Sequence, residues 1–107
     1  MSECILVITA INSQESAQKI AQTLVEQRLT ASVHVAGPIT STYWWKGKME
    51  IEEEWTCTAR TRKELYREVE KAILEIHLYD EPGIVALPIV DGSQSYLAWI
   101  ATETRVK

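Results

Sequence analysis

TASVHVAGPITSTYWWKGKMEIEEEWTCTARTR, residues 30–62, is the stretch that decides the fold, and it predicts two long strands joined at Trp45–Lys48. Apolar and polar side chains alternate along the second strand, and this period of two is typical of a half-buried antiparallel strand. One face carries Met49, Ile51, Trp55, Cys57 and Ala59, and the other carries Glu50, Glu52, Glu54, Thr56 and Thr58. Gly37-Pro38 interrupts the first strand, so we expect a bulge or bend there at a sheet edge.

The predicted ribbon is too long for the domain that carries it. Each arm of about 13–15 residues would extend roughly 45 Å at about 3.3 Å per residue. A globule of this size has a radius of gyration of about 13 Å. The tip carries Tyr43, Trp44, Trp45 and Met49, which are costly to leave in water. We therefore expect the tip to pack on another copy of the chain.

A strand and a helix are predicted before the ribbon. Cys4–Ile11 is a nearly continuous apolar run, which is typical of a central strand covered on both faces. Asn12–Glu15 has the pattern of a capping box and predicts the start of a helix that ends near Arg28. The first arm of the ribbon should then begin at Thr30 or Ala31.

Two helices and a strand are predicted after the ribbon. The second arm should end at Arg60, where a second capping box, Thr61–Glu64, opens a helix that runs to Ile76. Ile84–Val90 predicts a fourth strand, at an edge or with a bulge because it contains Pro88. A short third helix should follow a cap at Ser93.

The order βαββαβ with a terminal helix predicts an α+β fold, a ferredoxin-like sandwich with a long ribbon of its second and third strands. The first and third strands should lie at the centre of an antiparallel sheet, with two helices on one face. Trp55, or Ile and Val positions on the helix-free face, would then need a cover, which favours an oligomer.

Composition limits the classes of partner. The 107 residues fit one domain, 1–107, with 46% hydrophobic residues and a formal net charge of -4. No block of basic residues is present, so nucleic acid and anionic membranes are poor partners. Two cysteines outside any C-x-x-C pair, and an N-terminus without a signal-peptide pattern, favour a cytoplasmic protein.

Two motifs carry a resemblance to a known family. They are YWWKGK at residues 43–48 and HLYDEPGIVALP at residues 77–88, together with Glu54 and RTRKEL at residues 60–65. In these motifs the chain resembles the CutA-type divalent-cation tolerance proteins, from about residue 4 to 104. The resemblance implies a ferredoxin-like homotrimer, a link to copper and other divalent cations, no required cofactor and no established enzymatic activity. It also implies an architecture similar to that of the PII signalling proteins.

His77 and Glu54 are the candidate metal ligands. His77 falls at a helix C-terminus, where an imidazole either interacts with the last carbonyls and the helix dipole or binds a metal or ligand. Both interpretations stay open. Glu54 lies in an acidic run that forms either a solvated strand face or a site for a hard cation. If it is buried it needs a partner, such as Arg60 or Lys48 in a cleft between subunits.

Lys48, Glu54, Arg60 and Tyr79 are the candidate residues of a ligand cleft where the ribbon meets the 77–79 loop. Candidate residues of a trimer interface are Tyr43, Trp44, Trp45 and Trp55. Aromatic residues at a tip can also stack against a base or a cation, but they are more often the residues that anchor a subunit interface.

Three other residues are expected to be structural. His34 has no partner at ligand spacing. Cys4 and Cys57 should behave as small buried hydrophobic residues, although a disulfide between them stays open because their strands are predicted neighbours.

Two functions follow from the sequence. The first is a trimeric copper or divalent-metal tolerance protein that binds divalent cations weakly at clefts between subunits. The alternative is a PII-like regulatory trimer that holds a small organic ligand without binding metal directly. An enzyme is not expected, because no nucleophile–base pair can be argued from spacing.

Overall fold

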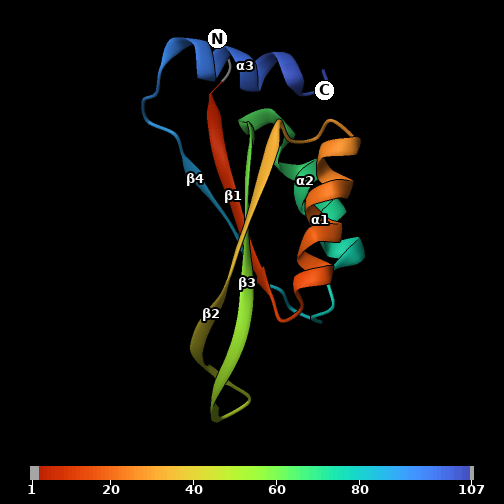
Figure 1. Ribbon diagram of the computed structural model, residues 1–107, viewed down its shortest axis with the longest axis vertical. Helices are drawn as coiled ribbons and strands as arrows, with labels where there is room; N and C mark the ends of the chain where they lie inside the picture. The colour runs from red at the N-terminus through yellow and green to blue at the C-terminus, as the bar shows by residue number, and fades with distance from the viewer. Residues whose placement is uncertain (1–2, 107) are drawn as a thin grey trace.

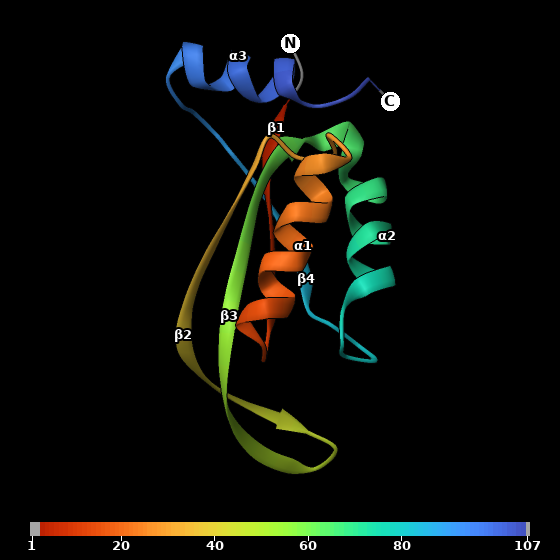
Figure 2. The ribbon, with the colours of Figure 1, turned by 45° about the vertical axis from the view of Figure 1, so that its right-hand side comes forward.

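A four-stranded sheet with two helices on one face forms the body of the molecule (Figures 1 and 2). The structure is a computed structural model and describes residues 3–106. Its strands are β1 (Cys4–Ile11), β2 (Ser32–Trp45), β3 (Lys48–Arg62) and β4 (Ile84–Pro88), and its helices are α1 (Gln14–Glu26), α2 (Tyr66–Ile76) and α3 (Gln94–Glu103). A 3-10 turn, Lys63–Leu65, joins β3 to α2.

The sheet is antiparallel with the strand order β2-β3-β1-β4, so the predicted central position of β1 and β3 is confirmed. Helices α1 and α2 lie side by side against one face, and α3 crosses the end of the sheet near the N-terminus (Figure 2). The predicted ferredoxin-like α+β sandwich is confirmed. Within residues 3–106, no helix combines the length and the apolar character needed to cross a membrane.

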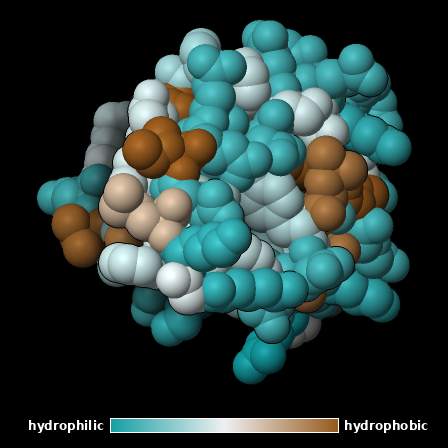
Figure 3. Space-filling view, turned by 90° about the horizontal axis from the view of Figure 1, so that it is seen from below, coloured by the Kyte–Doolittle hydropathy of each residue, from teal (hydrophilic) through white to brown (hydrophobic). Residues whose placement is uncertain are grey.

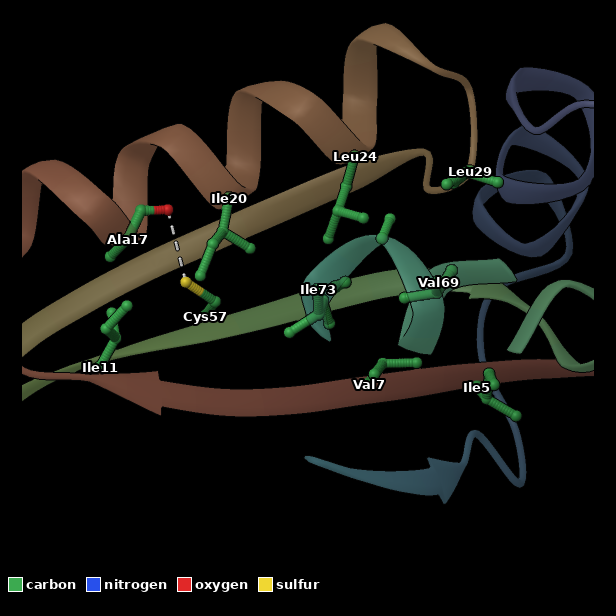
Figure 4. Packing of buried hydrophobic residues seen from close by; sticks show 12 residues of the cluster. Ile5, Val7, Ile11, Ala17, Ile20, Leu24, Leu29, Cys57, Val69 and Ile73 are labelled. Atoms are coloured by element: carbon green, nitrogen blue, oxygen red, sulfur yellow. Dashed lines mark hydrogen bonds between the residues drawn. The ribbon is translucent and has the colours of Figure 1, made fainter. Parts of the chain in front are cut away.

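The core lies between the helices and the face of β1 that carries Ile5, Val7 and Ile11 (Figure 4). These residues alternate along the strand, so they share one face. They meet Ala17, Ile20 and Leu24 of α1 and Val69, Ala72 and Ile73 of α2, all buried. Burying each large aliphatic side chain contributes about 1.5–3 kcal/mol. The opposite face of β1 meets a helix only at its start, where Cys4 contacts Leu97 of α3, so the predicted cover on both faces is wrong for most of the strand in one protomer.

The ribbon of β2 and β3 extends well beyond the core, as Figure 1 shows in its lower half. The molecule is 45 Å along its longest axis and 25 × 21 Å across. The strand register shifts between Ala36 and Ile39, which confirms the predicted bulge at Gly37-Pro38. At the tip, Lys46 and Gly47 both have positive φ, 50° and 80°, as in the tight turns that match the twist of a hairpin. In Figure 2 the tip curls back beneath the helices.

Both predicted capping boxes are wrong in detail. Helix α1 is capped by Ser13, whose Oγ accepts a hydrogen bond from the backbone N–H of Ser16 at 3.2 Å. The Asn12 side chain instead donates to Glu52. Thr61 belongs to β3, which continues to Arg62, and its hydroxyl donates to the carbonyl of Leu29 at 2.6 Å. A tertiary partner therefore outweighs the local cap at this position.

Two further expectations need correction. Strand β4 ends at Pro88 rather than Val90. Trp55 pairs with Ile11 and packs against the core on the helix-covered side, so it is not part of the helix-free face. The apolar residues on that open face include Ile8, Val85 and Leu87, and the last two are 55% and 46% exposed.

Candidate functional site

A cleft of about 720 Å³ lies where the curled ribbon faces the loop between α2 and β4. The ribbon contributes Ser41–Tyr43 and Trp45 from β2 and two carboxylates from β3, and the opposite wall is the loop 78–83. Ala10 of β1 also lines it. Figure 3, which views the molecule from the ribbon-tip end, shows a mainly hydrophilic surface with separate hydrophobic patches.

Glu54 is the most deeply buried acid of the cleft, with 7% exposure. Its Oε2 accepts a hydrogen bond from the Tyr79 hydroxyl at 2.6 Å. Its Oε1 accepts no hydrogen bond from the described residues, and among residues 3–106 no basic side chain forms an ion pair with it. Burial, and secondarily the bond to Glu54, raises the pKa of Tyr79 well above its usual range. Tyr79 therefore stays protonated and keeps donating to the carboxylate.

Glu52 forms a second acid–tyrosine pair two residues before Glu54. The Tyr43 hydroxyl donates to its Oε2 at 2.5 Å, and the Asn12 amide donates to its Oε1 at 2.8 Å. The bond from Tyr43, followed by that from Asn12, lowers the pKa of Glu52. The same bond raises the pKa of Tyr43 to about 12. The cleft therefore holds an ionised carboxylate at Glu52 near neutral pH.

Tyr43 and Glu52 were not predicted as residues of the cleft, and Asn12 was not predicted as a partner of Glu52. The alternation along β3 does contain a signal for Glu52, because residues 52 and 54 share a strand face. The partners of Glu52 are less visible in the sequence, since Asn12 comes from the β1–α1 junction, and its sequence pattern is that of a helix cap.

His77 ties the loop after α2 to strand β1. Its Nδ1 accepts the backbone N–H of Tyr79 at 3.1 Å, which requires that nitrogen to be unprotonated, so Nε2 carries the proton and donates to the carbonyl of Ala10 at 3.0 Å. Burial lowers the pKa of His77 and favours this neutral form, against the raising effects of the Ala10 carbonyl and Glu54. The ring bonds to β1 rather than to the last carbonyls of α2.

A complete metal site is not assembled within one protomer. Among the residues that the structure describes, no group of three or more His, Cys, Asp or Glu side chains converges in a way that could hold an ion. Both nitrogens of His77 already make hydrogen bonds, and Glu54 has one oxygen engaged. The metal role of His77 and Glu54 therefore stays a prediction.

Lys48 and Arg60 lie apart from Glu54 within the protomer. Each is six positions away along β3, in opposite directions, which is about 20 Å at roughly 3.3 Å per residue. Lys48 pairs with Trp45 at the tip, and Arg60 donates to the carbonyl of Thr58 at 2.9 Å. The structure thus brings Tyr79 and Glu54 together but not the two basic residues, and their pairing across subunits stays a prediction.

The tip residues expected at an interface are largely exposed. Trp44 is 74% exposed and Trp45 is 41% exposed, with the Lys46 ammonium 5.6 Å from the centre of the Trp45 ring. Tyr43 points its hydroxyl at Glu52 instead of standing free. The trimer interface also stays a prediction.

The two cysteines are free and buried, so no disulfide joins them. Cys4 pairs with Arg62, whereas Cys57 pairs with Thr9, five positions farther along β1. That offset of about 17 Å at roughly 3.3 Å per residue exceeds the reach of a disulfide. Cys57 donates to the carbonyl of Ala17 at 3.5 Å, and burial raises the pKa of its thiol to about 11. His34 is exposed opposite Thr58 on the ribbon.

Comparison with known proteins adds evidence that is independent of this geometry. The family described as "CutA1 divalent ion tolerance protein" matches residues 5–103. The chain is 36% identical over 101 residues to the divalent-cation tolerance protein CutA of Pyrococcus horikoshii, covering 94% of this chain and 98% of that protein. It is 34% identical to the chloroplastic protein CutA of Arabidopsis thaliana, over 94% of this chain and 56% of that protein.

Among solved structures, CutA1 of Oryza sativa superimposes with a TM-score of 0.96 at 30% sequence identity. The match covers 99% of this chain and 97% of that one. The similarity therefore includes the long ribbon and the loop that form the cleft.

Proposed function

Because the chain belongs to the CutA1 divalent ion tolerance family, we propose that it acts in tolerance of copper or other divalent ions as a homotrimer that binds these cations weakly at clefts between its subunits. The observation that carries the metal proposal is the cleft with carboxylates Glu52, Glu54, Asp80 and Glu81 on its walls. Carboxylate oxygens are ligands for divalent cations, particularly hard ones.

A second subunit is the source we propose for the missing ligands. One protomer gathers acidic side chains without bringing three ligands to a point, within the described chain. A ligand set divided between subunits, with Glu54 and His77 as its members from one protomer, would be incomplete until assembly. Binding at His77 would also have to displace its bond to Ala10 or to Tyr79. Both features favour weak binding.

Exposed apolar surface supports the proposed assembly. Val85 and Leu87 lie on the helix-free face of the sheet, and Trp44, Met49 and Ile51 are exposed on the ribbon by 74%, 59% and 66%. Soluble monomers rarely leave large apolar surfaces of this kind in water. A closed ring of three chains would cover both surfaces with one repeated contact.

Isothermal titration calorimetry with copper and with zinc tests the metal proposal. We expect weak, saturable binding to the native protein, reduced in His77→Ala and in Glu54→Gln. Glu53→Gln is the matched control, because it removes the same charge from the neighbouring exposed position. Absence of binding heat for the native protein would refute direct metal binding.

A second candidate function is favoured by the size of the cleft. A volume of about 720 Å³ falls within the range of about 300–1,000 Å³ that is usual for small-molecule sites and is far larger than a metal ion needs. In this alternative the protein is a PII-like regulator that holds a small organic ligand. Neither function requires a catalytic step. We also propose a cytoplasmic location, where a reducing environment suits two free cysteines.

A further inference from the structure

We propose that the flank of helix α3 formed by Tyr96 and Trp99 is a contact surface for a second copy of this chain, next to the helix-free face of the sheet. This inference rests on the assembly proposed above and adds a third surface to it, besides the sheet face and the ribbon. None of the interface residues predicted from the sequence belongs to α3.

Helix α3 carries more apolar side chain than its own protomer covers. Ile100 is fully buried, whereas Tyr96 and Trp99 are each 41% exposed. Their rings stack on each other, with centroids 5.6 Å apart and planes inclined by 23°. Residues three positions apart lie on the same side of a helix, so the pair forms one aromatic surface. A surface helix is usually polar where it faces water, so an aromatic flank of this kind indicates that another surface covers it.

The position of α3 places this flank beside the sheet face that neighbouring subunits are proposed to cover. The first half of the helix projects past β1 on the side away from α1 and α2, as both ribbon views show (Figures 1 and 2). Leu6 pairs with Leu87 on the helix-free face, and Cys4 shares that side of β1 because side chains alternate along a strand. The Cys4 Sγ lies 4.0 Å from the carbonyl oxygen of Leu97. Helix α3 therefore borders the helix-free face, and a subunit that covers Leu87 also meets the helix.

The charge of the helix favours a second copy of the same chain as the partner. No lysine, arginine, aspartate or glutamate occurs from Gln94 to Thr102, although 24% of the whole chain is charged. Two copies carry the same formal net charge of -4 and repel each other, so they associate best through surfaces that lack charge. Nucleic acid or an anionic membrane would require basic residues, which this segment does not contain.

Hydrogen bonds at the C-terminal end of α3 hold the helix in place for such a contact. The buried Arg62 donates from Nε to the Thr104 hydroxyl at 2.8 Å, and its guanidinium also donates to the carbonyl of Arg105. The backbone N–H of Arg105 donates to the carbonyl of Arg28 at 2.8 Å. A surface that is already fixed loses less conformational entropy on association. The helix is thus anchored at one end and presents its aromatic flank toward the other.

Hydroxyl-radical footprinting of the native protein tests the contact without changing the sequence. Mass spectrometry gives the oxidation rates of Tyr96, Trp99 and Leu74, and each rate is divided by the intrinsic reactivity of that side chain. Leu74, which is 52% exposed on helix α2, is the reference for an apolar residue that no subunit covers. We expect Tyr96 and Trp99 to be oxidised severalfold more slowly than Leu74 on this scale, because the centre of an interface excludes water. Similar rates for the three residues would overturn the proposal.

A double substitution measures what the contact contributes to the assembly. Tyr96→Gln with Trp99→Gln removes both rings but keeps good helix-forming residues and the buried Ile100. We expect light scattering to show that this variant separates into single chains at a lower guanidinium chloride concentration than the native protein does. Leu74→Gln is the matched control and should separate at the native concentration. An equal shift in both variants, or in neither, would contradict the contact.

The same measurements distinguish failure of this contact from failure of the assembly. A native protein with the mass of one chain would refute the proposed assembly and this contact together. A native protein with the mass of three chains, in which Tyr96 and Trp99 are oxidised as freely as Leu74, would overturn this contact alone.

Discussion

At the scale of single residues, the cleft depends on side chains that are held by neutral hydrogen bonds. The Tyr79 hydroxyl satisfies one oxygen of buried Glu54, and the uncharged imidazole of His77 joins the same loop to β1. Each bond orients a wall of the cleft without neutralising its negative charge. The charge is therefore left for a bound cation.

The His77 arrangement predicts a loss of stability in mild acid. Burial lowers its pKa in the folded protein below the usual 6.5, so between these two values the unfolded chain binds more protons. The free energy of unfolding that the neutral imidazole contributes is fully present above pH 6.5, the pKa in the unfolded chain. It is lost as the pH falls from 6.5 toward the lower pKa of His77 in the folded protein. Urea unfolding of metal-free protein at a series of pH values should show this decline.

His77→Gln is the variant that assigns the effect to the imidazole. Its stability should be lower near neutral pH, but it should decline less between pH 7 and 5 than that of the native protein. An equally steep decline in the variant would assign the pH dependence to another group.

At the scale of elements, the bulge in β2 brings the backbone at Gly37 close against β3. A Cβ on Gly37 would lie 2.6 Å from Cδ1 of Trp55 and 2.9 Å from the carbonyl oxygen of Glu54. Both distances are too short for ordinary contact. Close packing of the two strands at this point therefore requires the absence of a side chain.

Gly37→Ala should consequently lower the free energy of unfolding by about 1–3 kcal/mol, the usual cost of inserting a methyl group into a packed site. Gly83→Ala is the control, because a Cβ there meets no heavy atom within 4 Å. Chemical denaturation should show a clear loss for the first variant and little change for the second. Equal stability of the two variants would contradict the close packing at the bulge.

Regular patterns in the sequence predicted the elements well. The alternation in 49–59 and the Gly37-Pro38 interruption were enough to predict β3 and the bulge in β2, and the order of elements was enough to predict the sheet. The helix starts were harder, because Thr61 has a cap pattern but finds a buried partner in the carbonyl of Leu29. Local signals do not show when a tertiary hydrogen bond replaces a cap.

The cleft was predicted only in part. The sequence indicated that Glu54 and Tyr79 belong together, and the structure shows them hydrogen-bonded. Lys48 and Arg60 lie toward opposite ends of β3 in the protomer, so their pairing with Glu54 across subunits stays a prediction. The number of residues between two side chains on a strand gives the distance between them. The ribbon also curls, and this curl, which brings Tyr43 and Trp45 to the 78–83 loop, depends on the twist of the strands. Twist accumulates from packing and is not readable from residue types.

At the scale of the whole molecule, two faces of similar exposure have different expected roles. Val85 on the helix-free sheet face is 55% exposed, and Leu74 on helix α2 is 52% exposed. Only the first belongs to the surface that we propose the neighbouring subunits cover.

Val85→Glu should therefore weaken the trimer, whereas Leu74→Glu should leave it intact. Burying a carboxylate without a partner at a subunit interface costs several kcal/mol. Light scattering should give three times the 12.2 kDa chain mass for the native protein and for Leu74→Glu, and a smaller mass for Val85→Glu. A native protein with the mass of one chain would refute the assembly.

The most direct measurement of the central claim is a crystal structure of the native protein grown with copper. Anomalous scattering at the copper edge would locate the ion and identify its ligands. The account predicts copper at a boundary between subunits, bound by side chains from two protomers with Glu54 or His77 among them. Copper bound entirely within one protomer and away from the cleft, or no bound copper at all, would contradict it.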